Sequence, residues 1–301
     1  MLRELVNSEK LNYLGYSYGT ELGANYAALF PKNLGLFVLD GAVDPTLDPE
    51  TSLLRQIEGF DKALNAYLED CFSQVSCPLP SDLDEAKDTI GSILRGLEDR
   101  VMPTDYDRDL SLSAAIAGII VTLYSQDSWP YLSSAIEDAL AGDGSLLLML
   151  ADFYNDRDTE GGYLTNIIEA NSAIDCADQL TYPEIEQDLT SAITAASPVF
   201  GKYFAYGEGS CSGWPDGIGN QVLDFELNLT SQVLIVGTTG DPATPYEQAV
   251  SLNQMIAGSL LVTFEGEGHT AYGSNPCVND LVDRYLAGES LVQRDLTCSQ
   301  P

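Results

Sequence analysis

The stretch that decides the fold is Leu11-Asn-Tyr-Leu-Gly-Tyr-Ser-Tyr-Gly-Thr20, which contains a Gly-x-Ser-x-Gly pattern centred on Ser17. The apolar residues at its start predict a short buried strand, and apolar residues at helical spacing from Tyr18 to Phe30 predict a helix. In this context the glycines permit a tight turn that presents the Ser17 hydroxyl above a sheet. The Tyr18 backbone N–H, at the helix N-terminus, is then available to an oxyanion. The alternative is a strand-to-helix turn without chemistry.

Working outward, continuous apolar runs predict further buried strands at 34–39, 232–237 and 260–264, with helices at 246–256 and 278–286. Strand, helix and strand in close succession predict a parallel sheet, and therefore an α/β fold. From about 49 to 229 the pattern changes to helical periods broken by proline and glycine. The sequence therefore predicts a core at 1–48, a large helical cap at 49–229, and a return to the core at 230–301.

Composition excludes several classes of partner. The chain has 301 residues, of which 46 are acidic and 13 basic, and its formal net charge of -33 repels phosphate backbones and anionic lipid headgroups. We expect no nucleic-acid and no membrane partner. The longest uncharged stretch, 110–125, is too short to span a bilayer, so we expect a buried helix there. No CxxC motif or histidine cluster is present, and we predict no metal and no cofactor.

The six cysteines favour an oxidising compartment, although no signal peptide opens the chain. In sequence order they form three candidate disulfides, which are Cys71–Cys77, Cys176–Cys211 and Cys277–Cys298. Spacing alone allows 15 connectivities, and reduced core cysteines are the alternative. Cys211 also lies in a Gly-x-Cys-x-Gly pattern, but no strand precedes it and no second histidine is available to activate it. We therefore expect a disulfide partner there.

A nucleophilic serine needs a base, and His269, after the last predicted buried strand, is the one histidine in the chain. Asp241 follows the strand at 232–237 and is the candidate that orients the imidazole. The order Ser17, Asp241, His269 matches the order of roles in α/β-hydrolases. Asp241 is otherwise a turn residue before a proline, and Asp40 and Asp44 are the competing acids.

Several segments resemble the running text of the secreted tripeptidyl aminopeptidase-like branch of the α/β-hydrolases, which is related to the proline iminopeptidases. They are Leu11–Thr20, Val38–Pro45, Ala173–Asp178, Cys211–Pro215, Thr239–Pro245 and Gly268–Thr270. The resemblance implies a serine hydrolase that releases short peptides or single residues from free N-termini through an acyl-enzyme. It also implies a secreted or cell-envelope location, and it aligns Ser17, Asp241 and His269 with the catalytic triad.

The resemblance is incomplete at the N-terminus, because only about ten residues precede the nucleophile strand. Members of the fold normally have earlier strands and a loop that donates a second oxyanion N–H. We expect that part, with the usual export signal, to be absent. The edge of the sheet beside Leu11–Leu14 is then exposed, and we expect it to pair with an N-terminal complementing segment or to self-associate.

Two other functions stay open at this point. A carboxylesterase uses the same triad on small esters, and a non-catalytic remnant would at most bind peptides. In the predicted helical cap, Asp175 and Asp178 flank Cys176 and are candidates to pair with a substrate ammonium group. Trp214 is a candidate to line the substrate cleft. The alternatives are a solvated acidic surface and ordinary aromatic packing.

Overall fold

The fold was analysed in a computed structural model, which describes residues 2–158, 160–178, 187–204, 223–292 and 296–300. The chain divides into two compact units, one made of Met1–Asp48 with Gln221–Pro301 and the other of Pro49–Asn220. The second boundary falls at 220/221 rather than at the expected 229/230, because Leu227–Asn228 forms a strand that pairs with Ile256–Ala257 in the first unit.

The first unit is built on a parallel sheet, as the sequence predicts. Its strands, in the order in which they lie side by side, are β1 (Leu11–Tyr16), β2 (Leu34–Asp40), β4 (Val233–Gly240), β6 (Leu260–Glu267) and β7 (Thr297–Ser299). A second, two-stranded sheet joins β3 (Leu227–Asn228) to β5 (Ile256–Ala257). The short strand β7 was not predicted, because Thr297–Ser299 contains no apolar run.

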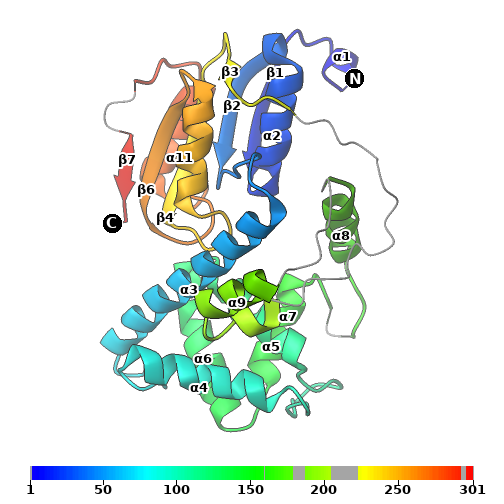
Figure 1. The fold of residues 1–301 in the computed structure, drawn as a ribbon, viewed down its shortest axis with the longest axis vertical. Helices are drawn as coiled ribbons and strands as arrows, with labels where there is room; N and C mark the ends of the chain where they lie inside the picture. The colour runs from blue at the N-terminus through cyan, green and yellow to red at the C-terminus, as the bar shows by residue number, and fades with distance from the viewer. Residues whose placement is uncertain (1, 159, 179–186, 205–222, 293–295, 301) are drawn as a thin grey trace. The chain divides into compact units, whose positions relative to one another are not determined.

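Helices cover both faces of this sheet. They are α2 (Tyr18–Leu29), α11 (Tyr246–Met255) and α12 (Pro276–Leu286). Two short elements complete the unit, which are the helix α1 (Leu2–Leu5) and the 3-10 turn η1 (Pro31–Asn33). Alternate residues of β2 face opposite sides: Phe37 packs in one apolar cluster with α2 and α11, and Val38 packs in another with α12. Figure 1 shows α2 and α11 lying over the same face of the sheet. These buried faces explain why the strands appear in the sequence as continuous apolar runs.

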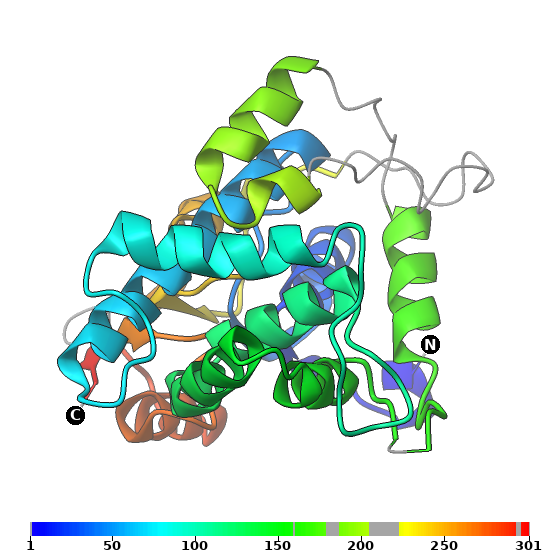
Figure 2. The same cartoon turned by 90° about the horizontal axis from the view of Figure 1, so that it is seen from below.

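The second unit is helical within its described residues. Its elements are α3 (Pro49–Ser73), α4 (Leu83–Gly96), α5 (Leu112–Leu123), η2 (Gln126–Ser128), α6 (Trp129–Leu140), α7 (Ser145–Tyr154), α8 (Ile167–Asp178), α9 (Gln187–Ala196) and α10 (Gly201–Phe204). Figure 2 shows these helices running in several directions rather than as a parallel bundle. The predicted buried helix within 110–125 is α5. At Gly118 of α5 a Cβ atom would lie 2.4 Å from the Leu147 carbonyl oxygen of α7, so a glycine allows the two helices to approach closely.

A charged group inside the second unit joins three of its elements. Lys87 Nζ of α4 lies 2.7 Å from Asp61 Oδ2 of α3, and the two side chains are only 12% and 13% exposed. Ser197 Oγ donates to Asp61 Oδ1 at 2.9 Å from the turn after α9. Because a buried charge needs a partner and further hydrogen bonds, this group fixes α3, α4 and that turn to one another.

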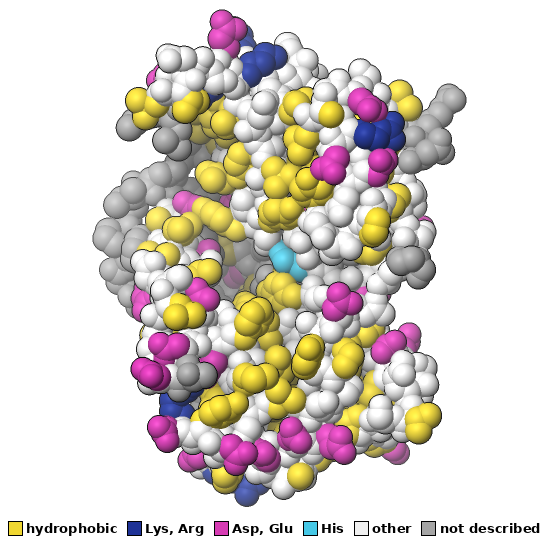
Figure 3. All heavy atoms as spheres, turned by 180° about the vertical axis from the view of Figure 1, so that it is seen from behind, with side chains coloured by type: hydrophobic (Ala, Val, Ile, Leu, Met, Phe, Trp, Pro, Cys, Tyr) yellow, Lys and Arg dark blue, Asp and Glu magenta, His cyan; other side chains and the backbone are white. Residues whose placement is uncertain are grey.

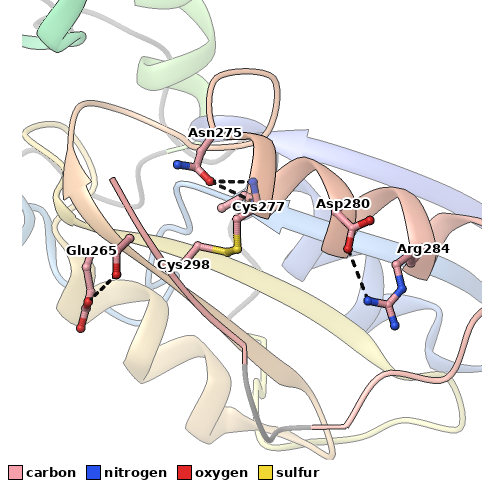
Figure 4. Close-up of a disulfide and its surroundings, with 8 residues drawn as sticks. Glu265, Asn275, Cys277, Asp280, Arg284 and Cys298 are labelled. Carbon is pink, nitrogen blue, oxygen red and sulfur yellow. Dashed lines mark hydrogen bonds and ion pairs between the residues drawn. A yellow bond between two sulfur atoms is a disulfide. The ribbon is translucent and has the colours of Figure 1, made fainter. Parts of the chain in front are cut away.

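Disulfides fasten both units. Cys71–Cys77 closes the end of α3, and Cys277–Cys298 joins the start of α12 to β7. Figure 4 shows the second bond beside Asn275, whose side chain accepts the Cys277 N–H and caps the helix. The remaining predicted pair includes Cys211, which lies outside the described residues. Two disulfides fit an oxidising compartment such as the cell exterior.

None of the helices that the structure describes combines the length and the apolar character needed to cross a membrane.

Candidate active site

Ser17 occupies the turn between β1 and α2, with φ 53° and ψ -123°. This is a backbone conformation that residues with a Cβ atom rarely adopt. Hydrogen bonds hold it there: the Ser17 N–H donates to the Asp40 carbonyl oxygen at 2.9 Å, and the Ser17 carbonyl accepts from the Thr20 N–H and hydroxyl at 2.8 and 2.6 Å. The turn is therefore a strained, over-determined elbow.

The two glycines of the pattern differ in their structural importance. A Cβ atom on Gly15 would lie 2.5 Å from the Gly19 carbonyl oxygen, so only glycine fits there. At Gly19 a Cβ atom would meet the Tyr13 hydroxyl at 3.4 Å, an ordinary contact. The sequence predicts that both glycines permit the tight turn. In the structure Gly15 satisfies a close approach, and the unusual backbone angles belong to Ser17.

His269 and Asp241 contact each other directly. His269 Nδ1 lies 2.9 Å from Asp241 Oδ1 and 3.0 Å from Oδ2. Asp241 directly follows β4, and His269 lies two residues beyond β6, the strand beside it in the sheet; Gly240 and Glu267 pair at the ends of these strands. The carboxyl ends of adjacent parallel strands thus bring the two side chains together. In a neutral imidazole that donates from Nδ1, the basic lone pair lies on Nε2, which can then act as a base.

Backbone donors surround the Asp241 carboxylate, which is completely buried. Oδ1 accepts from the backbone N–H groups of Ala243 and Thr244 at 3.0 and 2.8 Å. Oδ2 accepts from the Thr244 hydroxyl at 3.1 Å and from the Thr270 N–H at 3.2 Å. These bonds hold the carboxylate in one orientation. Thr244 was not singled out from the sequence, although Asp-Pro-Ala-Thr is typical of an Asp side chain that binds its own turn.

The competing acids occupy other positions. Asp40 is fully buried and accepts from the N–H groups of Ala271 at 3.0 Å and Tyr272 at 2.8 Å. Burial is the main cause that raises the pKa of its carboxyl to about 6; the two N–H donors oppose the rise, and the nearby Asp241 adds a smaller contribution to it. Asp44 accepts from the Thr46 N–H and hydroxyl at 2.9 and 2.6 Å within its own turn. Asp241 is therefore the acid that bonds to the imidazole.

Both Ser17 and His269 lie against the short segment that follows β2. Ser17 bonds to the carbonyl of Asp40, as described above. A methyl group in place of hydrogen on the next residue, Gly41, would lie 3.3 Å from His269 Cε1. The Ser17 elbow and the imidazole thus share one backbone support at the carboxyl edge of the sheet.

Tyrosines surround the elbow. Tyr18 begins α2, which directs its backbone N–H and the positive end of the helix dipole toward the turn. The Tyr16 and Tyr272 rings stack with centroids 6.4 Å apart, and the Tyr16 hydroxyl donates to the Tyr272 carbonyl oxygen. Tyr16 and Tyr18 are 40% and 37% exposed. Tyr16 directly precedes Ser17 and Tyr272 lies three residues after His269, but no sequence motif marks either tyrosine as part of the site.

The other predicted substrate-binding residues belong to the second unit. Asp175 and Asp178 lie on α8, where Asp175 is half-buried and Asp178 exposed. Burial, with a smaller contribution from Asp178, raises the pKa of Asp175. Among the described side chains of α8 only Cys176 is buried. Trp214 lies outside the described residues.

Two family models match this chain. Residues 1–104 match the model described as alpha/beta hydrolase fold, and residues 197–298 match the model described as TAP-like protein. The chain has the α/β-hydrolase fold. The parallel sheet, the elbow after β1 and the Asp241–His269 pair at the carboxyl ends of β4 and β6 agree with this assignment.

Individual relatives extend the comparison. Serine protease Hip1 of Mycobacterium tuberculosis is 37% identical over 95% of this α/β-hydrolase chain and 57% of its own length. Carboxylesterase B of the same organism is 34% identical over 90% of the chain and 53% of its own length. Tripeptidyl aminopeptidase of Streptomyces coelicolor is 28% identical over 99% of the chain and 56% of its own length. The chain thus spans little more than half the length of these relatives.

The surface of this α/β-hydrolase is acidic. On the face drawn in Figure 3, acidic side chains clearly outnumber basic ones, in keeping with the net charge of -33. Within the described part of the chain, no group of three or more His, Cys, Asp or Glu side chains is arranged to hold a metal ion. The His269 side chain is 11% exposed, so solvent reaches part of it.

Proposed function

We propose that the protein is a serine hydrolase in which Ser17 is the nucleophile, His269 the general base and Asp241 the acid that orients the imidazole. The hydrogen bonds between Asp241 and His269 Nδ1 are the observation that carries this proposal. They leave Nε2 as the basic nitrogen. The strained Ser17 elbow supports it, because such a turn presents its hydroxyl at the edge of the sheet.

The reaction follows from these groups. The Ser17 hydroxyl oxygen attacks the substrate carbonyl carbon while His269 Nε2 takes the hydroxyl proton. The Asp241 carboxylate stabilises the imidazolium, and the Tyr18 N–H donates to the oxyanion. The tetrahedral intermediate then collapses, the leaving amine or alcohol takes the proton from His269, and an acyl-Ser17 ester remains. Water, deprotonated by His269, releases the acid and restores Ser17.

We propose short peptides with free N-termini as the substrates. Support comes from the relatives named serine protease and tripeptidyl aminopeptidase, and from the match to the TAP-like family. An esterase is the second candidate, because a relative of similar coverage is named carboxylesterase B. The disulfides and the family favour a secreted or cell-envelope protein.

The helical unit is proposed to act as the cap that selects substrates. Within it, we propose Asp175 and Asp178 as partners of the substrate ammonium. The raised pKa of the half-buried Asp175 is consistent with a carboxyl group whose charge lacks full solvation. Asp175→Asn and Asp178→Asn should raise KM for free-amine peptides and spare N-acetylated peptides and esters. Equal effects on free and blocked substrates would leave these residues a solvation role only.

The experiment that tests the hydrolase itself uses a fluorophosphonate probe, with tripeptidyl anilides, aminoacyl anilides and short acyl esters as substrates. Probe labelling that disappears in Ser17→Ala, together with anilide turnover, is the expected result. Turnover of esters alone would favour the esterase. Absence of labelling and turnover would refute the hydrolase and favour a peptide-binding protein.

An exposed strand edge suggests a further partner. Within the described residues, β1 pairs only with β2, so its other edge offers unpaired backbone groups. We propose that one more strand pairs there, from a complementing N-terminal segment or a second copy. Light scattering over a concentration series distinguishes self-association, in which the average mass rises with concentration, from a monomer of constant mass.

A further inference from the structure

Two carboxylates hold the loop that follows His269. Asp241 Oδ2 accepts from the N–H of Thr270 at 3.2 Å. Asp40 accepts from the next two N–H groups, those of Ala271 at 3.0 Å and Tyr272 at 2.8 Å. Three consecutive backbone donors are thus bound by two buried acids. Asp241 also bonds to the imidazole, and Asp40 does not.

This loop needs such support because its backbone has a positive φ on both sides of the histidine, and on the Thr270 side that conformation is strained. Gly268 has φ 111° and Thr270 has φ 65°. A β-branched residue such as Thr270 rarely adopts a positive φ, and such a conformation persists only where surrounding contacts enforce it. The bonds to Asp40 begin at the residue directly after Thr270. Without them, the loop after the imidazole loses two of its three backbone N–H bonds to carboxylates.

The same residue also supports the nucleophile. The Asp40 carbonyl oxygen accepts the Ser17 N–H at 2.9 Å, while its side chain binds the loop after His269. Gly41, directly after it, approaches the imidazole and the Thr270 methyl group. Asp40 therefore joins the Ser17 elbow to the histidine loop through one residue at the end of β2.

Charge adds a second effect. The titratable groups that face Asp40 are Asp241 after β4, His269 after β6 and Tyr16 on β1. Its pKa of about 6 leaves Asp40 ionised at neutral pH, so two anions face one imidazole. An anion close to an imidazolium favours its charged form.

We propose that Asp40 is a positioning residue of this active site, holding Ser17 and the His269 loop in register and stabilising the imidazolium with its charge. This inference rests on the proposed hydrolase function. Asp40 acts through His269 and Ser17 rather than on the substrate.

The test compares Asp40→Asn with Asp44→Asn. Asp44 lies four residues after Asp40; its carboxylate accepts from Thr46 in its own turn, and its backbone N–H donates to Gln248. Because His269 is the one histidine, its imidazole NMR signals titrate without overlap. In Asp40→Asn the imidazole should lose its proton at a lower pH than in the wild type, because a nearby anion has been removed. The kcat should fall by about tenfold or more with little change in KM. Asp44→Asn should change neither quantity.

The outcomes separate the two proposals. If fluorophosphonate labels wild-type Ser17 but the two variants behave alike, the positioning role of Asp40 is wrong and the hydrolase stands. If wild-type Ser17 is not labelled, the hydrolase fails, and the His269 titration still decides whether Asp40 acts on the imidazole. Should Asp40→Asn not fold, the wild type carries the test. The amide signals of Ala271 and Tyr272, which donate to Asp40, should report the ionisation of that carboxyl group. The imidazole signals of His269 should change over the same pH range, and imidazole signals that do not respond there overturn the proposal.

Discussion

Replacing the strained Ser17 by glycine should make the protein more stable while abolishing the proposed activity. The residue is held at φ 53° and ψ -123°, a conformation that glycine adopts without steric cost. The matched reference is Ser17→Ala rather than the wild type. Alanine lacks the hydroxyl, as glycine does, but keeps the Cβ atom that causes the strain. The difference between the two variants therefore isolates the backbone conformation.

The magnitude follows from two opposing contributions. Backbone strain of this kind costs about 1–3 kcal/mol, and glycine removes it. Glycine also gives the unfolded chain more freedom, which costs the folded state about 0.5–1 kcal/mol relative to alanine. Ser17→Gly should therefore exceed Ser17→Ala in free energy of unfolding by about 1 kcal/mol. With an unfolding entropy of about 2.1 cal/mol/K per residue, that difference raises the Tm of a 301-residue chain by about 1.6 °C.

The assay is urea unfolding followed by far-UV circular dichroism at neutral pH. A second pair of variants at Ser134, an exposed position inside α6, provides the control. There the order should reverse, because glycine in a helix interior is about 1 kcal/mol less favourable than alanine. The reasoning is refuted if Ser17→Gly is no more stable than Ser17→Ala while the Ser134 pair behaves as expected.

Three further predictions concern stability. Asp61→Asn leaves Lys87 largely buried without its anion and should cost the helical unit about 3 kcal/mol in urea unfolding. Replacing Cys277 and Cys298 together by serine opens a loop with a sequence separation of 21 and should cost about 3 kcal/mol. The Asp40 carboxyl has its pKa raised from 3.8 to about 6, so its neutral form is the one the fold favours. The wild type should therefore lose about 3 kcal/mol relative to Asp40→Asn as the pH rises from about 4 through 6.

Each of these has a control. Asp88→Asn removes the partner of Arg95 in an exposed ion pair and should cost less than about 1 kcal/mol, and a cost equal to that of Asp61→Asn would contradict the role of burial. The Cys71–Cys77 pair closes a shorter loop, with a separation of 6, and its removal should cost only about 2 kcal/mol. A stability difference between wild type and Asp40→Asn that does not vary with pH would show that Asp40 ionises normally.

The α/β fold and its principal strands could be predicted because buried parallel strands appear as continuous apolar runs. The run at 34–39 corresponds to β2, and the runs at 232–237 and 260–264 correspond to β4 and β6. β7 could not be predicted, because the three residues Thr297–Ser299 have no pattern of their own. Their place depends on pairing with β6 and on the Cys277–Cys298 bond, both of which join distant parts of the chain.

The sequence identifies two members of the candidate site but does not decide between the two candidate acids. The Gly-x-Ser-x-Gly pattern and the single histidine select Ser17 and His269. Asp40 and Asp241, by contrast, both follow predicted strands and are equivalent in sequence. Strand order separates them: β4 lies directly beside β6, while β2 lies one strand further away. Asp241 therefore bonds to the imidazole, and Asp40 bonds to the loop beyond it.

Two features of this site lower the stability of the fold, and both lie at the same end of the sheet. Ser17 keeps a backbone conformation that glycine would relieve, and Asp40 keeps a buried charge that is unfavourable above pH 6. Both lie where β1 and β2 end side by side, with Tyr16 paired to Asp40. A sheet optimised for stability alone would have neither feature. Their presence at the same strand ends as Asp241 and His269 is expected of a site in which positions and charges are fixed before substrate arrives, at the expense of stability.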